Sequence, residues 1–384
     1  MTRFFLTAPF IAFAMRIDAI TLTGFRNYEE QSISFVPGVN LIVGDNAQGK
    51  TNLLEAVTYL SVGRSFRTRR EAELIRFGAE FADLQADIFS HEREMQLRAV
   101  LFSGRRPRQL FIGGVKQKTA EALSGLLTTV LFCPDDLSLL LSGAANRRRL
   151  LDAALCQLRP RYAAALSEYT RLYEQKSRIL KDRFENPSLL QVLPEYNTRM
   201  AQVGALLISG RAKYLRELSK YAELYHEKFS SKKERLELHY KTVSTITDPF
   251  APPRLLYEKL LEHQKSHHTA ELESMQCLSG PHKDDFEATV NGLSIKSFGS
   301  QGQVRTAAIS IKLAERRIFK DDTGEEPILL LDDVLSELDP GRQDFVLNQI
   351  KTGQVLITCC EKNKLTNLGK VIFVENGRIQ EGRT

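Results

Sequence analysis

The stretch of the chain with the clearest chemistry is a glycine-rich loop at residues 44–51, which reads G-x-x-x-x-G-K-T. It follows an apolar run and precedes a helix-like pattern, which is the strand–loop–helix context of a phosphate-binding loop. Glycines let the backbone N–H groups of such a loop face phosphate oxygens at a helix N-terminus. We expect Lys50 to reach the β- and γ-phosphates and the Thr51 hydroxyl to bind Mg²⁺, so the sequence predicts a site for a nucleoside triphosphate with Mg²⁺. The predicted nucleotide contacts along this stretch are Gly44, Asp45, Asn46, Ala47, Gln48, Gly49, Lys50, Thr51 and Asn52.

Two carboxylates follow a second apolar run, at residues 328–331. An apolar strand that ends in Asp is the Walker B arrangement, in which a rigid, buried strand holds a carboxylate beside the metal ion. We expect Asp332 to orient the Mg²⁺ that Thr51 binds. Asp333 is predicted to point to the other face of the strand end and to polarise the attacking water as a general base. Asp333 and Lys50 are therefore the predicted catalytic residues, and Thr51 and Asp332 the predicted metal ligands.

A third motif, at residues 300–303 (SQGQ), opens an amphipathic helix pattern. It resembles the signature motif of the ATP-binding cassette superfamily, in which a serine and glycine amides at a helix N-terminus bind the γ-phosphate held by the opposite subunit. The resemblance implies that ATP lies between two copies of the chain and drives homodimerisation. The further nucleotide contacts expected are Ser300, Gly302 and Gln303, with Asp339 from the loop at residues 336–339.

Composition and charge describe a protein with an ordinary core and a mild preference for anionic partners. Of its 384 residues, 42% are hydrophobic and 26% are charged, and the formal net charge is +6. The five cysteines show no C-x-x-C spacing, which is typical of reduced thiols, so we expect a cytoplasmic location. Residues 4–14 superficially resemble a short secretory signal, but the run is too short to span a membrane. We interpret residues 1–14 as an N-terminal extension and expect the folded chain to begin near Met15.

The elements that must position these motifs alternate between two kinds of hydrophobic pattern. Period-two and continuous apolar runs predict strands before residue 135 and again in the last hundred residues. The predicted strands are 16–22, 84–89, 96–102, 109–112, 236–240, 286–290, 328–331 and 355–358. Between them, apolar residues at 3-4 spacing predict one long helix through residues 155–179 and a second through 196–229, packed as a hairpin.

These patterns predict an α/β fold with a mixed sheet and an inserted, mainly helical lobe. We expect residues 15–135 and 277–384 to form one ATPase lobe and residues 136–276 to form the helical insertion. Two basic clusters, at residues 63–70 and 105–108, lie in the first part of the ATPase lobe. They are either solvated hairpin tips or contacts with the phosphates of nucleotide or DNA, and the sequence leaves both interpretations open.

Taken together, the motifs resemble the RecF family of bacterial recombination and repair ATPases, which is related to SMC-type ATPase heads. The matching segments are 22–28 (LTGFRNY), 44–51, 63–68 (GRSFRT), 134–137 (PDDL), 147–152 (RRRLLD), 280–285 (GPHKDD), 299–306 (GSQGQVRT) and 331–339 (LDDVLSELD). The resemblance implies an ABC/SMC-type P-loop head, with Arg26 and Asn27 also at the nucleotide. It further implies an ATP-dependent homodimer that binds duplex DNA near single-strand gaps, works with RecO and RecR to load RecA, and supports the SOS response. ATP hydrolysis would be weak, DNA-stimulated and used as a switch.

An alternative from a different class is the ATPase subunit of a membrane transporter. Such subunits usually carry Glu where this chain has Asp333, and a His after the last core strand, whereas no His occurs here beyond His282. The segment 358–360 (TCC) occupies that region, which leaves the γ-phosphate sensor open. A long-armed SMC protein is a third alternative, but the insertion is short and contains no C-x-x-C hook. We therefore favour a DNA-binding ATPase without a membrane partner.

Overall fold

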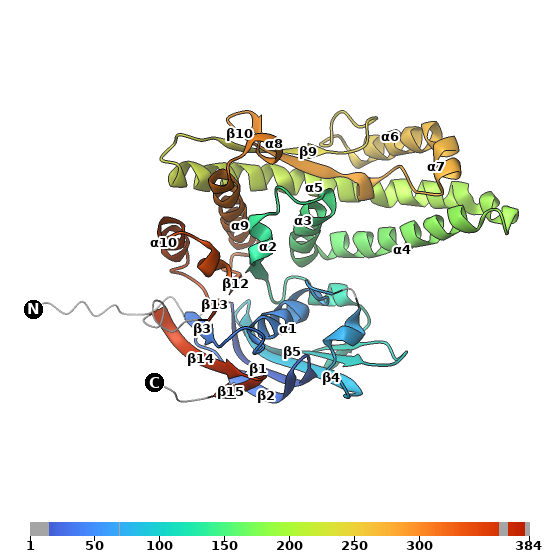
Figure 1. Cartoon of the computed structure of the whole chain (residues 1–384). Coiled ribbons are helices and arrows are strands. Elements are labelled where there is room, and N and C mark those ends of the chain that lie inside the picture. Colours follow the sequence, from blue (N-terminus) through green and yellow to red (C-terminus); the bar gives the residue numbers. More distant parts are fainter. Residues whose placement is uncertain (1–14, 69, 361–367, 381–384) are drawn as a thin grey trace, which may run out of the picture. The chain divides into compact units, whose positions relative to one another are not determined.

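The structure is a computed structural model and describes residues 15–68, 70–360 and 368–380. The extension predicted at residues 1–14 lies outside this range. The described chain divides into two compact units, of which the first comprises residues up to 136 and from 315 onward, and the second residues 137–314. The chain therefore leaves the first unit after Asp136 and re-enters it within helix α9 (Gln301–Thr323) (Figure 1).

A mixed six-stranded sheet forms one layer of the first unit, in the order β15-β14-β3-β13-β12-β8. All neighbours are parallel except β14 and β15, and the bounds are β3 Val39–Val43, β8 Thr129–Phe132, β12 Ile328–Asp332, β13 Val355–Cys359, β14 Gly369–Glu375 and β15 Arg378–Gln380. The apolar run of β12 is continuous because all five of its residues are buried. Since parallel strands end at the same edge, the segments that follow β3, β12 and β13 meet there.

An antiparallel sheet with the order β2-β1-β4-β5-β6-β7 forms the second layer of the first unit. Its strands are β1 Arg16–Phe25, β2 Tyr28–Ser34, β4 Phe81–Ser90, β5 Arg93–Phe102, β6 Gln109–Ile112 and β7 Val115–Gln117. In β4 every second residue is buried, as the alternating pattern predicts for a sheet with one face in water. Helix α1 (Lys50–Val62) shares one hydrophobic core with residues of both sheets, which explains why the helix is apolar almost all round.

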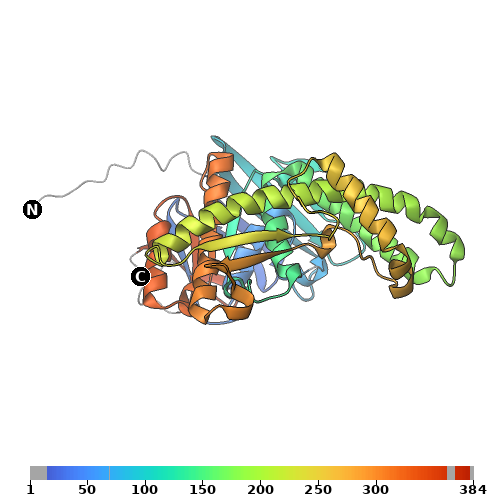
Figure 2. The same cartoon turned by 90° about the horizontal axis from the view of Figure 1, so that it is seen from above.

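The second unit combines helices with a small antiparallel sheet, β11-β10-β9. The long helix α5 packs against α4 and α6 and against strand β9, and Figure 2 shows these elements side by side. The bounds are α3 Ala144–Leu158, α4 Pro160–Asp182, α5 Leu193–Phe229, β9 Leu236–Lys241, α6 Pro253–Ser266, α7 His268–Ser274, β10 Asp285–Val290, β11 Leu293–Ser294 and α8 Ile295–Phe298. The predicted α/β fold with a mixed sheet and a mainly helical insertion is confirmed.

Two expectations about the second unit need correction. The first long helix is two helices, α3 and α4, because Pro160 has no N–H to continue the hydrogen-bond ladder of α3 and instead begins α4. The sequence patterns place the end of the insertion at residue 276, whereas the second unit continues to Ala314. The physical reason is that β10 pairs antiparallel with β9 over its whole length, from Asp285 opposite Lys241 to Val290 opposite Leu236.

Candidate nucleotide-binding site

The phosphate-binding loop connects β3 to α1, and its two glycines are required by close neighbours. A Cβ atom on Gly44 would lie 2.2 Å from the carbonyl oxygen of Val374, and one on Gly49 would lie 2.8 Å from the side-chain amide of Asn27. Gly49 is also the N-cap of α1 with a φ of 120°, which side chains rarely adopt. The loop therefore passes close to β14 on one side and to the β1–β2 turn on the other, and only glycine fits at both positions.

Lys50 curls back over the loop that precedes it. Its Nζ donates to the carbonyl oxygens of Gly44 (2.7 Å) and Asp45 (3.1 Å) and to the Sγ of Cys360 (3.3 Å). The Oδ2 of Asp333 lies 3.9 Å away. The side chain is only 4% exposed, so its charge sits in a region of low dielectric where attraction to an anion is strong. An ammonium that is held by neutral acceptors at the start of a helix is suited to phosphate.

Thr51 and Asp332 are brought together, as the sequence predicts. The Thr51 hydroxyl donates to Oδ1 of Asp332 over 2.9 Å, and the Thr358 hydroxyl donates to the same oxygen, also over 2.9 Å. Burial raises the pKa of Asp332, while the two hydroxyl donors and the charge of Arg67 lower it in part. The adjacent carboxylate and hydroxyl oxygens are ligands that Mg²⁺ prefers, and they come from neighbouring segments at the carboxyl edge of the sheet.

Asp333 does not point to the other face of the strand, and this expectation was wrong. Strand β12 ends at Asp332, and Asp333 adopts the left-handed conformation with a φ of 49°, so the alternation of side chains stops there. Its N–H donates to the Thr358 hydroxyl over 2.8 Å, and its carboxylate faces Lys50. Both acidic side chains therefore lie on the side of the phosphate-binding loop.

Asn27 and Asn52 tie the phosphate-binding loop to the β1–β2 turn. The Asn27 amide donates to the carbonyl oxygen of Gln48 (2.8 Å) and accepts from the Asn52 amide (2.8 Å). The same Gln48 carbonyl also accepts from the N–H of Gly377 (2.9 Å). Asn27, which the family resemblance implied, thus contacts the loop directly.

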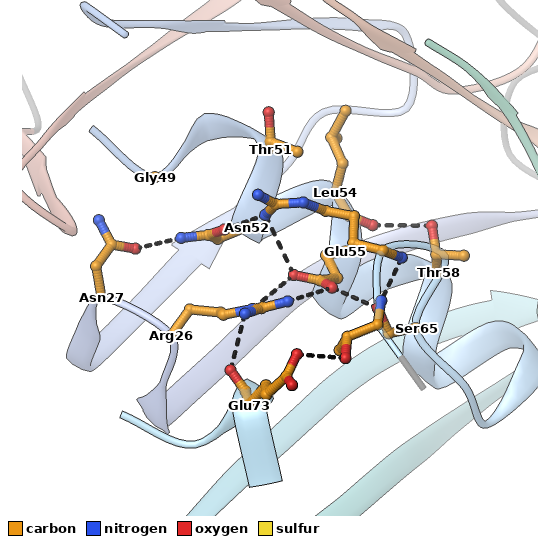
Figure 3. A network of polar contacts seen from close by, with 12 residues as sticks. Arg26, Asn27, Gly49, Thr51, Asn52, Leu54, Glu55, Thr58, Ser65 and Glu73 are labelled. Carbon is orange, nitrogen blue, oxygen red and sulfur yellow. Dashed lines mark hydrogen bonds and ion pairs between the residues drawn. The ribbon is translucent and has the colours of Figure 1, made fainter. Parts of the chain in front are cut away.

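Glu55 organises a polar network beside the phosphate-binding loop that the sequence patterns did not reveal. Its fully buried carboxylate accepts two hydrogen bonds from the Arg26 guanidinium (both 2.9 Å) and one from Ser65 (2.5 Å), and Arg67 lies 3.5 Å away (Figure 3). Arg67 in turn donates to Asn52 over 2.8 Å. The network fixes two arginines at the base of the loop, one from the β1–β2 turn and one from the basic cluster at residues 63–70. A charged residue in the buried face of α1 was the signal that could have revealed it.

The Ser300 turn belongs to the second unit, where it forms a capping box for α9. The Gln303 N–H donates to the Ser300 hydroxyl (3.2 Å), and the Ser300 N–H donates to the Gln303 side chain (3.0 Å). Gln303 also donates to Glu234 over 2.8 Å. In the first unit, Asp339 caps α10 (Pro340–Gln349) by accepting from the Arg342 N–H. Each of these residues thus orders the start of a helix.

Comparison with known proteins gives a consistent result. The profile of the family described as RecF/RecN/SMC N terminal domain matches residues 16–380. The chain is 35% identical over 372 residues to the DNA replication and repair protein RecF of Acetivibrio thermocellus, covering 96% of this chain and 100% of the relative. It is 36% identical over 371 residues to the protein of the same name from Clostridium perfringens, with 95% and 100% covered.

Solved structures agree. The structure of the recombination mediator protein RecF with ATP has a TM-score of 0.87 at 31% identity, with 97% of this chain and 99% of that chain covered. The Smc head domain of Pyrococcus furiosus has a TM-score of 0.54 at 17% identity, over 95% of each chain, and shows the fold alone. Neither these relatives nor these structures support the alternative of a transporter subunit. Within the described part of the chain, no helix is both long and apolar enough to cross a membrane.

Proposed function

The chain belongs to the RecF family of DNA replication and repair proteins, and from this premise we propose that it is an ATP-dependent, DNA-binding dimer switch. The observation that carries the proposal is the juxtaposition of Lys50, Thr51 and Asp332 at the edge of the mixed sheet. A solved structure of a RecF protein with ATP, to which this chain is similar, supports the choice of nucleotide.

The residues at the loop fit ATP with Mg²⁺. The Lys50 ammonium and the N–H groups at the start of α1 attract phosphate, and the Thr51 and Asp332 oxygens are suited to the metal ion. Thr51 and Asp332 would hold Mg²⁺, which would supply positive charge to offset that of the phosphates. Asn27 and Arg26 hold the loop and the adjacent turn in place through Gln48 and Glu55, so that the site is ordered before the nucleotide arrives.

A second copy of the chain completes the site. The Ser300 turn lies at the first turn of α9, where backbone N–H groups and the helix dipole favour an anion. Its capping box fixes the turn, and Gln303 is further held by Glu234. In this proposal the Ser300, Gly302 and Gln303 region contacts the γ-phosphate bound by the partner copy, with Asp339 at the same interface. ATP would then join two copies, and its hydrolysis would release them.

Hydrolysis is weak, DNA-stimulated and limits the lifetime of the dimer. Asp333 is the residue proposed to accept a proton from the attacking water, because its carboxylate faces the phosphate-binding loop. Lys50 stabilises the negative charge that develops on the phosphate. The left-handed backbone at Asp333, fixed by the Thr358 hydroxyl, aims the carboxylate.

The ATP-bound dimer binds duplex DNA near single-strand gaps, works with RecO and RecR to load RecA, and supports the SOS response. Family membership and the net charge of +6 support the DNA-binding part. A direct test measures binding to a fluorescent duplex with ATP, with ADP and without nucleotide, over a series of salt concentrations. We expect ATP-dependent binding that weakens steeply with salt, because phosphate contacts release counterions. Absence of duplex binding at low salt in the presence of ATP would overturn the proposal.

A further inference from the structure

Phe77 projects fully into solvent from an ordered turn of the first unit. The turn is closed by the N–H of Ala79, which donates to the carbonyl oxygen of Arg76 over 2.9 Å, and Gly78 allows it with a φ of 84°. The Phe77 ring is entirely exposed, whereas Ile75, two residues earlier, is buried. An aromatic ring that is held in water by an ordered backbone contributes nothing to the core, so its role must be sought outside the fold.

The turn adjoins a second loop that carries arginines. Strand β4 begins at Phe81, which is 44% exposed and pairs directly with Phe102 at the end of β5. The Ser103 N–H donates to the Glu80 carbonyl over 3.0 Å, which joins the base of the Phe77 turn to the base of the loop at residues 103–108. In that loop the Arg106 guanidinium stacks on the Phe102 ring at 4.0 Å from its centroid.

The arginines of this loop are available for an anion. Arg105 and Arg106 are exposed, and neither forms an ion pair with any residue in the described part of the chain. Arg108, by contrast, is turned inward and pairs with Glu71. We define the Phe77 patch as Phe77, Phe81, Phe102, Arg105 and Arg106. It combines two exposed rings, Phe77 and Phe81, and the half-buried ring of Phe102 with two arginines that form no ion pair in the described part of the chain.

We propose that the Phe77 patch binds an unpaired base, with Phe77 stacking on the base and Arg105 and Arg106 contacting the flanking phosphates. Aromatic rings beside a positively charged groove are the chemistry with which proteins hold single-stranded nucleic acid. A protein partner is less well matched, because protein interfaces exclude water over a contiguous apolar core, and this patch contains two exposed arginines. The proposal rests on the proposed DNA-binding function and deepens it.

The geometry implies a preference among DNA substrates. Bases inside an uninterrupted duplex are already stacked on both faces, so a projecting ring can stack only on an end, a gap or a single strand. The arginines contact phosphates in either case. The patch therefore adds affinity where a duplex gives way to a single strand, and adds little on continuous duplex.

The test compares two probes of equal length, a continuous fluorescent duplex and the same duplex with an internal gap, both with ATP present. Stacking is worth about 1–3 kcal/mol per base, so Phe77→Ala should weaken binding to the gapped probe roughly 5- to 150-fold and leave the continuous duplex unchanged. Phe77→Trp should retain the gap preference. Phe184→Ala is the matched control, because Phe184 is 74% exposed and carries the Arg183 guanidinium on its ring at 4.0 Å, and it should change neither affinity.

A second readout uses 2-aminopurine placed at the gap. We expect its fluorescence to be quenched by the wild-type protein and by Phe77→Trp but not by Phe77→Ala. Equal weakening of both probes by Phe77→Ala, or no effect on either, would overturn the proposal, and the second result would make a protein the better candidate for the patch. If the wild-type protein bound no duplex at all, the proposed DNA-binding function would be contradicted, and this result would not test the Phe77 patch. Binding of an oligo(dT) strand at low salt, with and without Phe77, would then decide the patch alone.

Discussion

Replacing Glu55 by glutamine removes one charge from the centre of the polar network in Figure 3 while keeping the shape of the side chain. In the wild-type protein the buried carboxylate accepts two hydrogen bonds from the Arg26 guanidinium, which also donates to the Glu73 carbonyl oxygen, and the carboxylate lies 3.5 Å from Arg67. Glutamine retains one acceptor oxygen, but its NH₂ group faces the Arg26 guanidinium. Glu55→Gln therefore leaves the Arg26 guanidinium, which is 19% exposed, without its counter-charge.

The expected loss follows from the burial of the pair. Removing one partner of a buried ion pair costs about 3–5 kcal/mol. The retained acceptor of glutamine and the partial exposure of Arg26 place the expectation at the lower end, about 3 kcal/mol of unfolding free energy. Glu73→Gln is the matched control in the same network. The exposed Glu73 side chain accepts a hydrogen bond from Thr68, and its loss should cost less than about 1 kcal/mol.

Equilibrium unfolding in urea measures both variants, together with Arg26→Met and the double variant Glu55→Gln/Arg26→Met. We expect the double variant to be more stable than the sum of the two single losses predicts. The double variant contains neither the Glu55 nor the Arg26 charge, so no unpaired charge is left in the network. ATP affinity should fall in Glu55→Gln as well, since Arg26 precedes Asn27, whose amide holds the phosphate-binding loop. A loss below about 1 kcal/mol for Glu55→Gln, with additive single effects, would show that the two side chains do not act as a buried ion pair.

The site and one half-buried histidine support three more predictions. Lys50→Arg should retain weak ATP binding, measured by calorimetry, and lose ATP-driven dimerisation. The bulkier guanidinium cannot occupy the tight position of the ammonium over the loop. Normal dimerisation of this variant would contradict the prediction. Ser300→Arg should bind ATP as a monomer but not dimerise in light scattering, because the residue acts on the partner's nucleotide; loss of ATP binding by the monomer would argue against that role. Burial lowers the pKa of His282 to about 4, so below pH 6.5 the folded state binds fewer protons than the unfolded state. The free energy of unfolding should therefore fall by about 2 kcal/mol between pH 7 and pH 5. His282→Gln should lose that part of the pH dependence, and an unchanged pH dependence would contradict the assignment.

Local chemistry made the phosphate-binding loop and its strands predictable from the sequence. The G-x-x-x-x-G-K-T pattern fixes the loop, and a continuous apolar run such as that of β12 can be stable only when it is buried on both faces. Two parallel strands that end at one edge then bring Thr51 and Asp332 together, whatever lies between them in the chain. The fold class followed from the same patterns.

Long-range contacts and single-residue backbone geometry were not predictable. Pairing of β10 with β9 keeps residues 285–290 in the second unit, which extends to Ala314, and strand pairing between segments so far apart in the chain leaves no local signal. The alternation of side chains along β12 does not extend to Asp333, because Asp333 itself has a left-handed backbone conformation. The charge of Glu55 in the apolar face of α1 is a local signal, but its partners Arg26 and Ser65 lie outside the helix and could not be identified from the sequence pattern.

Our central proposal is that ATP joins two copies of this chain and that Asp333 ends the joined state. Size-exclusion chromatography with light scattering, performed with ATP and Mg²⁺ on the wild-type protein and on Asp333→Asn, tests it most directly. We expect Asp333→Asn to remain a dimer as long as ATP is present, because binding groups persist while the water loses its base, and the wild-type protein to return to monomer as ATP is consumed. An Asp333→Asn protein that binds ATP and stays monomeric would contradict the proposal.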